Sequence, residues 1–331
     1  MKRLPKISKV EVDDYRTVAK SKVVDELDHL LEPGQIFCPV QRRYVERVKQ
    51  FIVNDDGLVA EAGVLKGMVE DIESHYFYHQ DEIDPLFKTI NGRLAKIFNY
   101  DGFRDRKRCG GEWLMRILLK NIKYCPYCNA ETVYSISRTD KGDIKSSFDH
   151  FYPQGRYPFL AISLYNLIPS CYRCNSQFKR DHYEESLETF HPYLDDVDEQ
   201  AVFVLNGLTD EMLKGKADCS GLKILLKPLK EVDECQVQDK IDKYNVLFAV
   251  NDVYTQLFAD DALRIVELAK VFNQDYIDQV KKWFSGAGLE VDFERILFGT
   301  PFCRKKIENY RHSKLTLDLF REYGVKFNSE Y

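Results

Sequence analysis

Four of the nine cysteines form two Cys-x-x-Cys pairs, Cys125 with Cys128 and Cys171 with Cys174. A Cys-x-x-Cys turn lets two thiolates reach one metal ion, and two such turns complete a tetrahedral zinc site. Forty-two residues lie between Cys128 and Cys171, so we expect the pairs to flank a folded insert. A site with four protein ligands is closed, which predicts a structural zinc ion. A redox role is the alternative, but two pairs within one basic segment favour metal.

The residue types that phosphodiester cleavage requires lie between the cysteine pairs and directly after them. "DHFYP" contains Asp149 and His150, "LYNLIPSC" contains Asn166, and "CNSQFK" contains Asn175. Cleavage needs a base that activates water, a cation that neutralises developing charge, and a group that orients the base. Histidine has the unperturbed pKa nearest neutrality. Carboxylate and amide oxygens suit Mg²⁺ or Mn²⁺, and an asparagine can hold an imidazole through a hydrogen bond.

This segment, from Cys125 to Lys179, resembles the HNH (ββα-metal) endonucleases whose fold is stapled by two Cys-x-x-Cys pairs. Five features occur in order: a cysteine pair, Asp-His followed by Pro, one Asn, a second cysteine pair, and Asn directly after it. The resemblance implies that His150 is the general base and that Asp149 and Asn175 ligate one catalytic Mg²⁺ or Mn²⁺ ion. It also implies that Asn166 fixes the loop and helps to orient His150. Many family members carry His where this chain has Asn175.

Each of these residues also has a simpler interpretation. Asp149 and Asn166 are common turn residues, Asn175 can cap a helix, and His150 can be a satisfied histidine packed on Phe151. Their combination within one zinc-binding frame favours the nuclease interpretation.

Basic side chains are concentrated around the cysteine pairs. Residues 102–182 carry 14 Lys or Arg against 7 Asp or Glu, whereas the whole chain has a net charge of −5. A local positive region on an acidic protein suits attraction of phosphate. We predict nucleic-acid contacts for Arg156, Arg173, Lys179 and Arg180. "FRDRKR" (Phe103–Arg108) either follows a DNA backbone or forms a linker, and solvated surface charge is the alternative for each of these residues.

Hydrophobic periodicity predicts a mostly helical α+β chain of 331 residues. The predicted helices of the N-terminal part are Arg42–Val53, Asp81–Tyr100 and Gly110–Tyr124. Glu131–Arg138 and Ile144–Phe148 read as strands, and a helix begins at Asn175, so the HNH segment is expected to be strand, turn, strand, loop and helix. In the C-terminal part, short strands at 201–205 and 221–226 precede helical segments.

We therefore expect three regions: a helical region at 1–120, an HNH nuclease core with its zinc site at 121–190, and a mixed, mainly helical region at 191–331. The acidic stretch Pro192–Gln200 reads as a solvated linker. The five remaining cysteines are expected to be buried small side chains.

No apolar run reaches membrane-spanning length, and the N-terminus has no signal-peptide pattern, so we expect a cytoplasmic protein without a membrane partner. The stretch Ile296–Phe320 resembles the ends of HNH proteins that act beside an ATPase in Septu-type and retron anti-phage systems. No G-x-x-x-x-G-K-[ST] motif is present, so any ATPase would be a separate subunit. The hypothesis is a DNA-cutting defence nuclease that acts on phage or plasmid DNA. The alternatives are a stand-alone restriction enzyme and a zinc-stapled nucleic-acid-binding module without catalysis.

Overall fold

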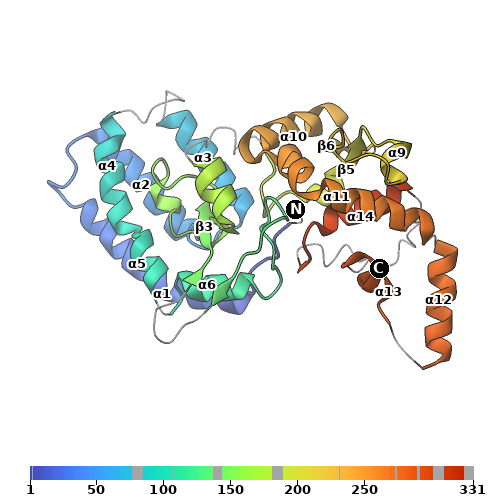
Figure 1. Cartoon of the computed structure of the whole chain (residues 1–331). Helices are drawn as coiled ribbons and strands as arrows, with labels where there is room; N and C mark the ends of the chain where they lie inside the picture. Colours follow the sequence, from blue (N-terminus) through green and yellow to red (C-terminus); the bar gives the residue numbers. More distant parts are fainter. Residues whose placement is uncertain are drawn as a thin grey trace. The chain divides into compact units, whose positions relative to one another are not determined.

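The computed structural model describes residues 1, 3–76, 85–106, 108–136, 144–180, 189–230, 232–272, 274–288, 291–300 and 309–323. Over these ranges the chain is mostly helical and carries small two-stranded antiparallel sheets, which confirms the mostly helical α+β prediction. The chain divides into two compact units (Figure 1). The hairpin unit comprises Leu4–Lys120 and Tyr134–Asn175, and the C-terminal unit comprises Met1–Arg3, Asn121–Val133 and Ser176–Tyr331.

The hairpin unit is built from amphipathic helices. They are α1 (Lys9–Leu30), α2 (Pro39–Asn54), α3 (Ala62–His75), α4 (Pro85–Ile97), α5 (Tyr100–Asp105) and α6 (Gly111–Leu118). In α2, Val45, Val48, Phe51 and Ile52 are buried, as their helical spacing predicted. The sequence analysis did not predict α1 or α3, although the buried residues of both helices recur every three or four positions. Ser8 caps α1 by accepting a hydrogen bond from the Glu11 backbone N–H.

Two short antiparallel pairs follow these helices. β1 (Ser135–Ile136) pairs with β2 (Ile144–Lys145), and β3 (Ser147–His150) pairs with β4 (Leu167–Ser170). The first pair lies where the sequence predicted a strand, a turn and a second strand. The sequence analysis did not predict β4, which contains Pro169. A two-stranded ladder tolerates this proline, because a strand with only one neighbour leaves one of its edges free of ladder hydrogen bonds.

The loop between β3 and β4 is anchored on the helical part of the same unit, where Figure 1 shows β3 lying among the helices. The Tyr15 hydroxyl donates to the Ile162 carbonyl at 2.7 Å. The Ser163 hydroxyl donates to the Gly57 carbonyl at 2.8 Å, and the Leu164 N–H to the Leu58 carbonyl at 3.0 Å. The first 120 residues therefore position the loop that connects the two strands.

A helical segment, η3 (Arg173–Lys179), follows β4 and has π-helical hydrogen bonding. It begins two residues before the position that the sequence predicted. Residues 181–188, which include His182, lie outside the described residues. The order after residue 146 is therefore strand, loop, strand and helix.

The C-terminal unit contains β5 (Ala201–Asn206) paired with β6 (Lys223–Pro228), close to the predicted strands. Three helices pack on this sheet: α10 (Glu234–Phe248) and α11 (Val250–Val271) contact β6, and α14 (Ser313–Tyr323) contacts β5 and α11. Ala249, with φ of 47°, separates α10 from α11. The smaller helices are α8 (Val197–Gln200), α9 (Asp210–Leu213), α12 (Gln274–Gly286) and α13 (Phe293–Phe298).

Two sequence predictions are corrected by the structure. The stretch at 192–200 is not a solvated loop, because Asp196 and Asp198 are buried and α8 lies within it. The Lys314 ammonium compensates the buried charge at 3.3 Å from Asp198 and 2.9 Å from Asp318. The expectation of buried cysteines holds for Cys109, whereas Cys235 is exposed and Cys38 and Cys219 are partly exposed; Cys303 lies outside the described residues.

Among the described helices, none combines the length and the apolar character that crossing a bilayer requires.

Candidate active site and metal centre

The two Cys-x-x-Cys pairs converge on one buried cluster. The Sγ atoms of Cys125, Cys128, Cys171 and Cys174 all lie within 4.8 Å of one another. A tetrahedral zinc ion with Zn–S bonds of about 2.3 Å requires S···S separations of about 3.8 Å. Each of the four residues is at most 3% exposed, so the donor set, its spacing and its burial fit a closed zinc site.

Local hydrogen bonds hold the turn that carries Cys125 and Cys128. The Cys125 N–H donates to the Glu131 carbonyl, and the Asn129 N–H to the Cys125 carbonyl, each at 2.8 Å. Asn129 adopts φ of 49°, a left-handed conformation that asparagine tolerates. This left-handed residue directly follows Cys128 at the end of the turn.

Helices α10 and α11 of the C-terminal unit also pack against this turn. The Tyr127 ring stacks on Phe248 with 4.5 Å between ring centroids. The Tyr254 hydroxyl donates to the Cys128 carbonyl at 2.9 Å. The first cysteine pair therefore depends on aromatic residues more than a hundred positions further along the chain.

The second cysteine pair lies at the junction of β4 and η3. The Cys174 N–H donates to the Cys171 sulfur at 3.5 Å, and the Asn175 N–H to the Cys171 carbonyl at 3.1 Å. These bonds place Asn175 at a fixed position directly after the metal cluster. The structural site and the asparagine of the motif are thus connected by one short turn.

Asn175 lies against β3 on the side where Asp149 projects. Its amide nitrogen donates to the Ser147 hydroxyl at 2.8 Å and to the Phe148 carbonyl at 3.3 Å. Alternate residues of a strand project to the same face, so the Ser147 and Asp149 side chains share the face that Asn175 contacts. Asp149 is only 5% exposed. Because the amide nitrogen is engaged by β3, the Asn175 oxygen is the atom suited to a cation.

His150 is the last residue of β3, and its ring is held on two sides. Its Nε2 lies 3.0 Å from the Ala161 carbonyl oxygen. A carbonyl only accepts hydrogen bonds, so Nε2 carries the proton and Nδ1 is the acceptor nitrogen of the neutral ring. The Tyr100 ring packs edge-on against the imidazole with 4.4 Å between centroids. These contacts fix both the tautomer and the orientation of the ring.

Asn166 is fully buried and bonds to the backbone of the loop. Its Oδ1 accepts from the Tyr152 N–H at 2.7 Å, and its Nδ2 donates to the carbonyls of Tyr152 at 3.1 Å and Leu160 at 2.9 Å. Leu160 precedes Ala161, the residue that binds His150. These contacts act on His150 through the loop, and none of them is a direct contact with the imidazole.

The four predicted nucleic-acid contacts occupy different environments. Arg156 is buried, and its guanidinium forms a two-point ion pair with Glu73, with both N···O distances at 2.7 Å. This ion pair favours a structural role for Arg156, and its phosphate contact stays a prediction. Lys179 is only 2% exposed, so little of its side chain is available at the surface, and its contact also stays a prediction. Arg173 is partly exposed and Arg180 is exposed, so these two stay predictions.

Tyr100 and Ala161 contribute to the site, and the sequence analysis did not identify them. Burial raises the pKa of Tyr100 to about 12, so its phenol stays neutral at physiological pH. Ala161 contributes only its carbonyl group. Neither contact has a sequence signature, because each depends on a fold that brings α5 and the loop onto the end of β3.

The described structure is thus that of a mostly helical α+β protein with a buried four-cysteine cluster that fits zinc. The comparison with known proteins adds two partial similarities. Over 123 residues the chain is 29% identical to protein ea31 of Escherichia phage lambda, covering 35% of this chain and 38% of that protein. Over 88 residues it is 32% identical to the Septu protein PtuB of Bacillus thuringiensis, covering 27% of this chain and 34% of that protein.

These similarities are distant, and each spans little more than a third of the relative's length. No family model matches the chain. No solved structure matches it either.

Proposed function

We propose that this protein is a metal-dependent HNH endonuclease that hydrolyses phosphodiester bonds of DNA. The observation that carries the proposal is the arrangement around β3. Asn175 lies on the Asp149 face, and His150, at the strand end, donates its Nε2–H to Ala161. The order of β3, β4 and η3 supports the ββα core that the motif implies. The cysteine cluster supports the structural zinc site that accompanies this core.

Asp149 and Asn175 would hold one Mg²⁺ or Mn²⁺ ion through their oxygens. When bound, such an ion neutralises the charge that develops on the phosphate and on the leaving oxygen. His150 takes a proton from the attacking water at Nδ1, and the Ala161 carbonyl stabilises the resulting imidazolium at Nε2. Asn166 keeps that carbonyl in place through Leu160. The buried zinc site, held by Cys125, Cys128, Cys171 and Cys174, contributes only to the fold.

The biological role that we propose is anti-phage defence together with a separate ATPase subunit. The similarity to a Septu protein supports it, as does the resemblance of the C-terminal stretch to HNH proteins that act beside an ATPase. The partner would control when the nuclease cuts.

The test is plasmid cleavage with Mg²⁺ or Mn²⁺, comparing the wild type with His150→Ala, each alone and with the product of a neighbouring ATPase gene. We expect divalent-dependent cleavage that falls by about 100-fold or more in His150→Ala, because a positioned general base contributes roughly that factor. Glu70→Ala, on the exposed face of α3, is the control and should cut like the wild type.

Two outcomes count against the proposal. Cleavage that survives His150→Ala would place the active site elsewhere. DNA binding without cleavage under every condition would favour the non-catalytic zinc-stapled module.

A further inference from the structure

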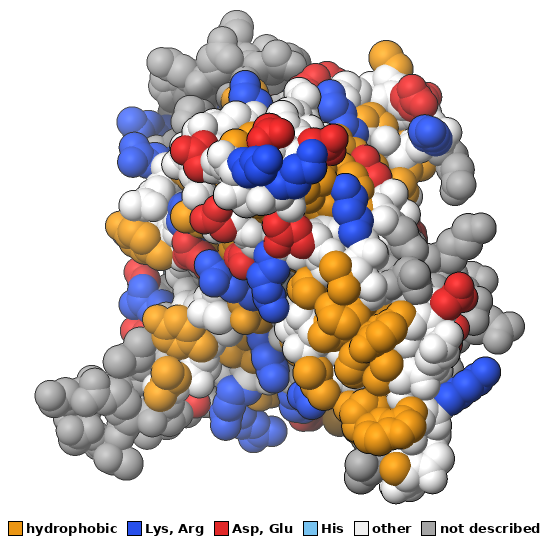
Figure 2. Space-filling model, turned by 45° about the vertical axis from the view of Figure 1, so that its right-hand side comes forward, with side chains coloured by type: hydrophobic (Ala, Val, Ile, Leu, Met, Phe, Trp, Pro, Cys, Tyr) orange, Lys and Arg blue, Asp and Glu red, His pale blue; other side chains and the backbone are white. Residues whose placement is uncertain are grey.

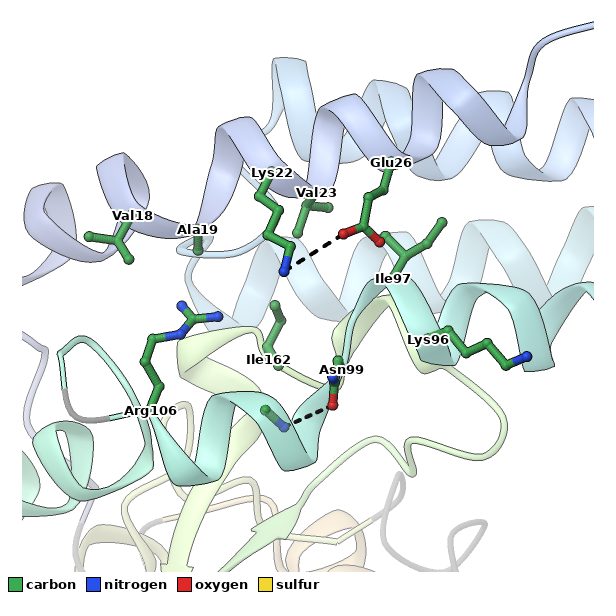
Figure 3. A pocket seen from close by; sticks show the side chains of 11 residues that line it. Val18, Ala19, Lys22, Val23, Glu26, Lys96, Ile97, Asn99, Arg106 and Ile162 are labelled. Carbon is green, nitrogen blue, oxygen red and sulfur yellow. Dashed lines mark hydrogen bonds and ion pairs between the residues drawn. The ribbon is translucent and has the colours of Figure 1, made fainter.

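A cavity of about 240 Å³ lies within the hairpin unit, between α1 and the segment that joins α4 to α5 (Figure 3). Its apolar lining consists of Val18, Ala19, Val23, Ile97 and Ile162. Its polar lining consists of Lys22, Glu26, Lys96, Asn99 and Arg106. A water molecule occupies about 30 Å³ in the liquid, so the cavity is large enough for a small organic ligand.

The polar lining favours an anion. It contains three cationic side chains and one carboxylate, and Glu26 is paired with Lys22 at 3.8 Å. The Nη1 atom of Arg106 is buried and has no hydrogen-bond partner within the described part of the chain. Leaving a buried donor unsatisfied costs about 1–3 kcal/mol, so this guanidinium is suited to an acceptor that the chain itself does not supply. Figure 3 shows the Arg106 guanidinium and the Lys22 ammonium facing the same space.

Two residues that line the cavity are sequence neighbours of the residues that contact His150. Ile162 follows Ala161, whose carbonyl binds His150 at 3.0 Å, and Asn99 precedes Tyr100, whose ring packs on His150. Consecutive Cα atoms are about 3.8 Å apart. The cavity and the contacts that hold His150 are therefore formed by the same two chain segments.

We propose that this cavity binds a nucleotide of the substrate strand. Arg106 and Lys22 bind its phosphate, and the apolar lining contacts its sugar or base. Arginine binds phosphate through charge-assisted hydrogen bonds, and an apolar wall suits the faces of a base. The inference rests on the proposed nuclease function and identifies the residues that position the substrate strand.

The experiment measures the binding of a 5′-labelled single-stranded oligonucleotide by fluorescence anisotropy, without Mg²⁺ and in a His150→Ala background, so that cleavage does not interfere. Arg106→Gln and Lys22→Ala are the test variants. We expect each to weaken the Kd about ten-fold and to lower the slope of log K against log salt by about one. Lys22 is 74% exposed, so Lys22→Ala leaves folding intact even if Arg106→Gln does not.

The controls match the charge and the local structure of the test residues. Arg104→Gln lies in the same "FRDRKR" segment but outside the cavity, where Arg104 pairs with Asp101 and Asp105 at 3.0 Å. Lys66→Ala breaks the Lys66–Glu70 pair, which has the same i,i+4 spacing and the same 3.8 Å distance as Lys22–Glu26. Both control variants should bind the oligonucleotide as the His150→Ala parent does.

Competition with free deoxynucleoside monophosphates and with inorganic phosphate separates the possible ligands. Displacement by a monophosphate at lower concentration than by phosphate supports the nucleotide pocket. Equal losses in the cavity variants and in Arg104→Gln would overturn it in favour of general surface charge. Unchanged binding in both cavity variants would also overturn it and would leave water as the occupant. The plasmid assay with His150 intact tests the nuclease function separately.

Discussion

At the residue scale, the site depends on groups that have two functions. Asn175 binds β3 through its amide nitrogen and presents an oxygen on the Asp149 face. His150 donates through Nε2, so its other nitrogen is the acceptor. In both cases one end of the side chain is fixed by the fold and the other end is suited to the proposed chemistry. A capping asparagine and a catalytic ligand are therefore compatible interpretations of the same residue.

Replacement of Asn175 separates these two functions. Asn175→Asp and Asn175→Leu both lose the amide donor, so each should lower the free energy of unfolding by about 1 kcal/mol in a urea titration. Only the leucine variant also loses the oxygen, and we expect its cleavage rate to fall by about 100-fold or more while Asn175→Asp keeps its metal dependence. Full cleavage by Asn175→Leu would show that the residue is only a structural contact to β3.

At the element scale, the two cysteine turns are short and have little hydrophobic core of their own. Backbone N–H···O bonds hold both turns, and an N–H···S bond adds to the second. Aromatic residues of α10 and α11 also hold the turn of Cys125 and Cys128. Metal binding contributes directly to the stability of such elements, because the ligands are brought together only in the folded state.

Zinc analysis tests the cluster. The protein purified without chelators should contain about one zinc ion per chain, and Cys171→Ser should lose the metal and unfold at a lower temperature. Cys235→Ser is the matched control, since Cys235 is exposed and lies outside the cluster, and it should keep both zinc and stability. Zinc retention by Cys171→Ser would mean that the four sulfurs do not share one ion.

At the scale of the whole molecule, basic and acidic side chains are interspersed on the face in Figure 2, although residues 102–182 carry an excess of basic residues in the sequence. Arg156 and Lys179 are buried and do not contribute to such a surface. Binding of phosphate is therefore expected at discrete sites, and the nucleotide cavity is one candidate.

The predicted nuclease core at 121–190 should not fold as an isolated fragment. It would lose the contacts of Tyr127 and Cys128 with Phe248 and Tyr254, and those of its loop with Tyr15 and Gly57. We expect the fragment to show no cooperative thermal unfolding and to bind less zinc than the full chain does, measured side by side by circular dichroism and metal analysis. A cooperative unfolding transition with one bound zinc ion would establish an autonomous domain.

The sequence alone determined the features that depend on residue type and local spacing. The cysteine pairs, the Asp-His motif, the amphipathic face of α2 and the strands β5 and β6 all follow from patterns within a few neighbouring residues. The tertiary structure decided which charges are available: Arg156 and Lys179 are buried, and the aspartates near residue 196 are buried where a solvated linker was predicted.

The tertiary structure also supplied β4, the Ala161 and Tyr100 contacts to His150, and the cavity beside them. The physical reason is the same in each case. Burial and long-range pairing depend on surfaces contributed by segments far apart in the chain, and local hydrophobic period and turn chemistry do not record which surfaces meet.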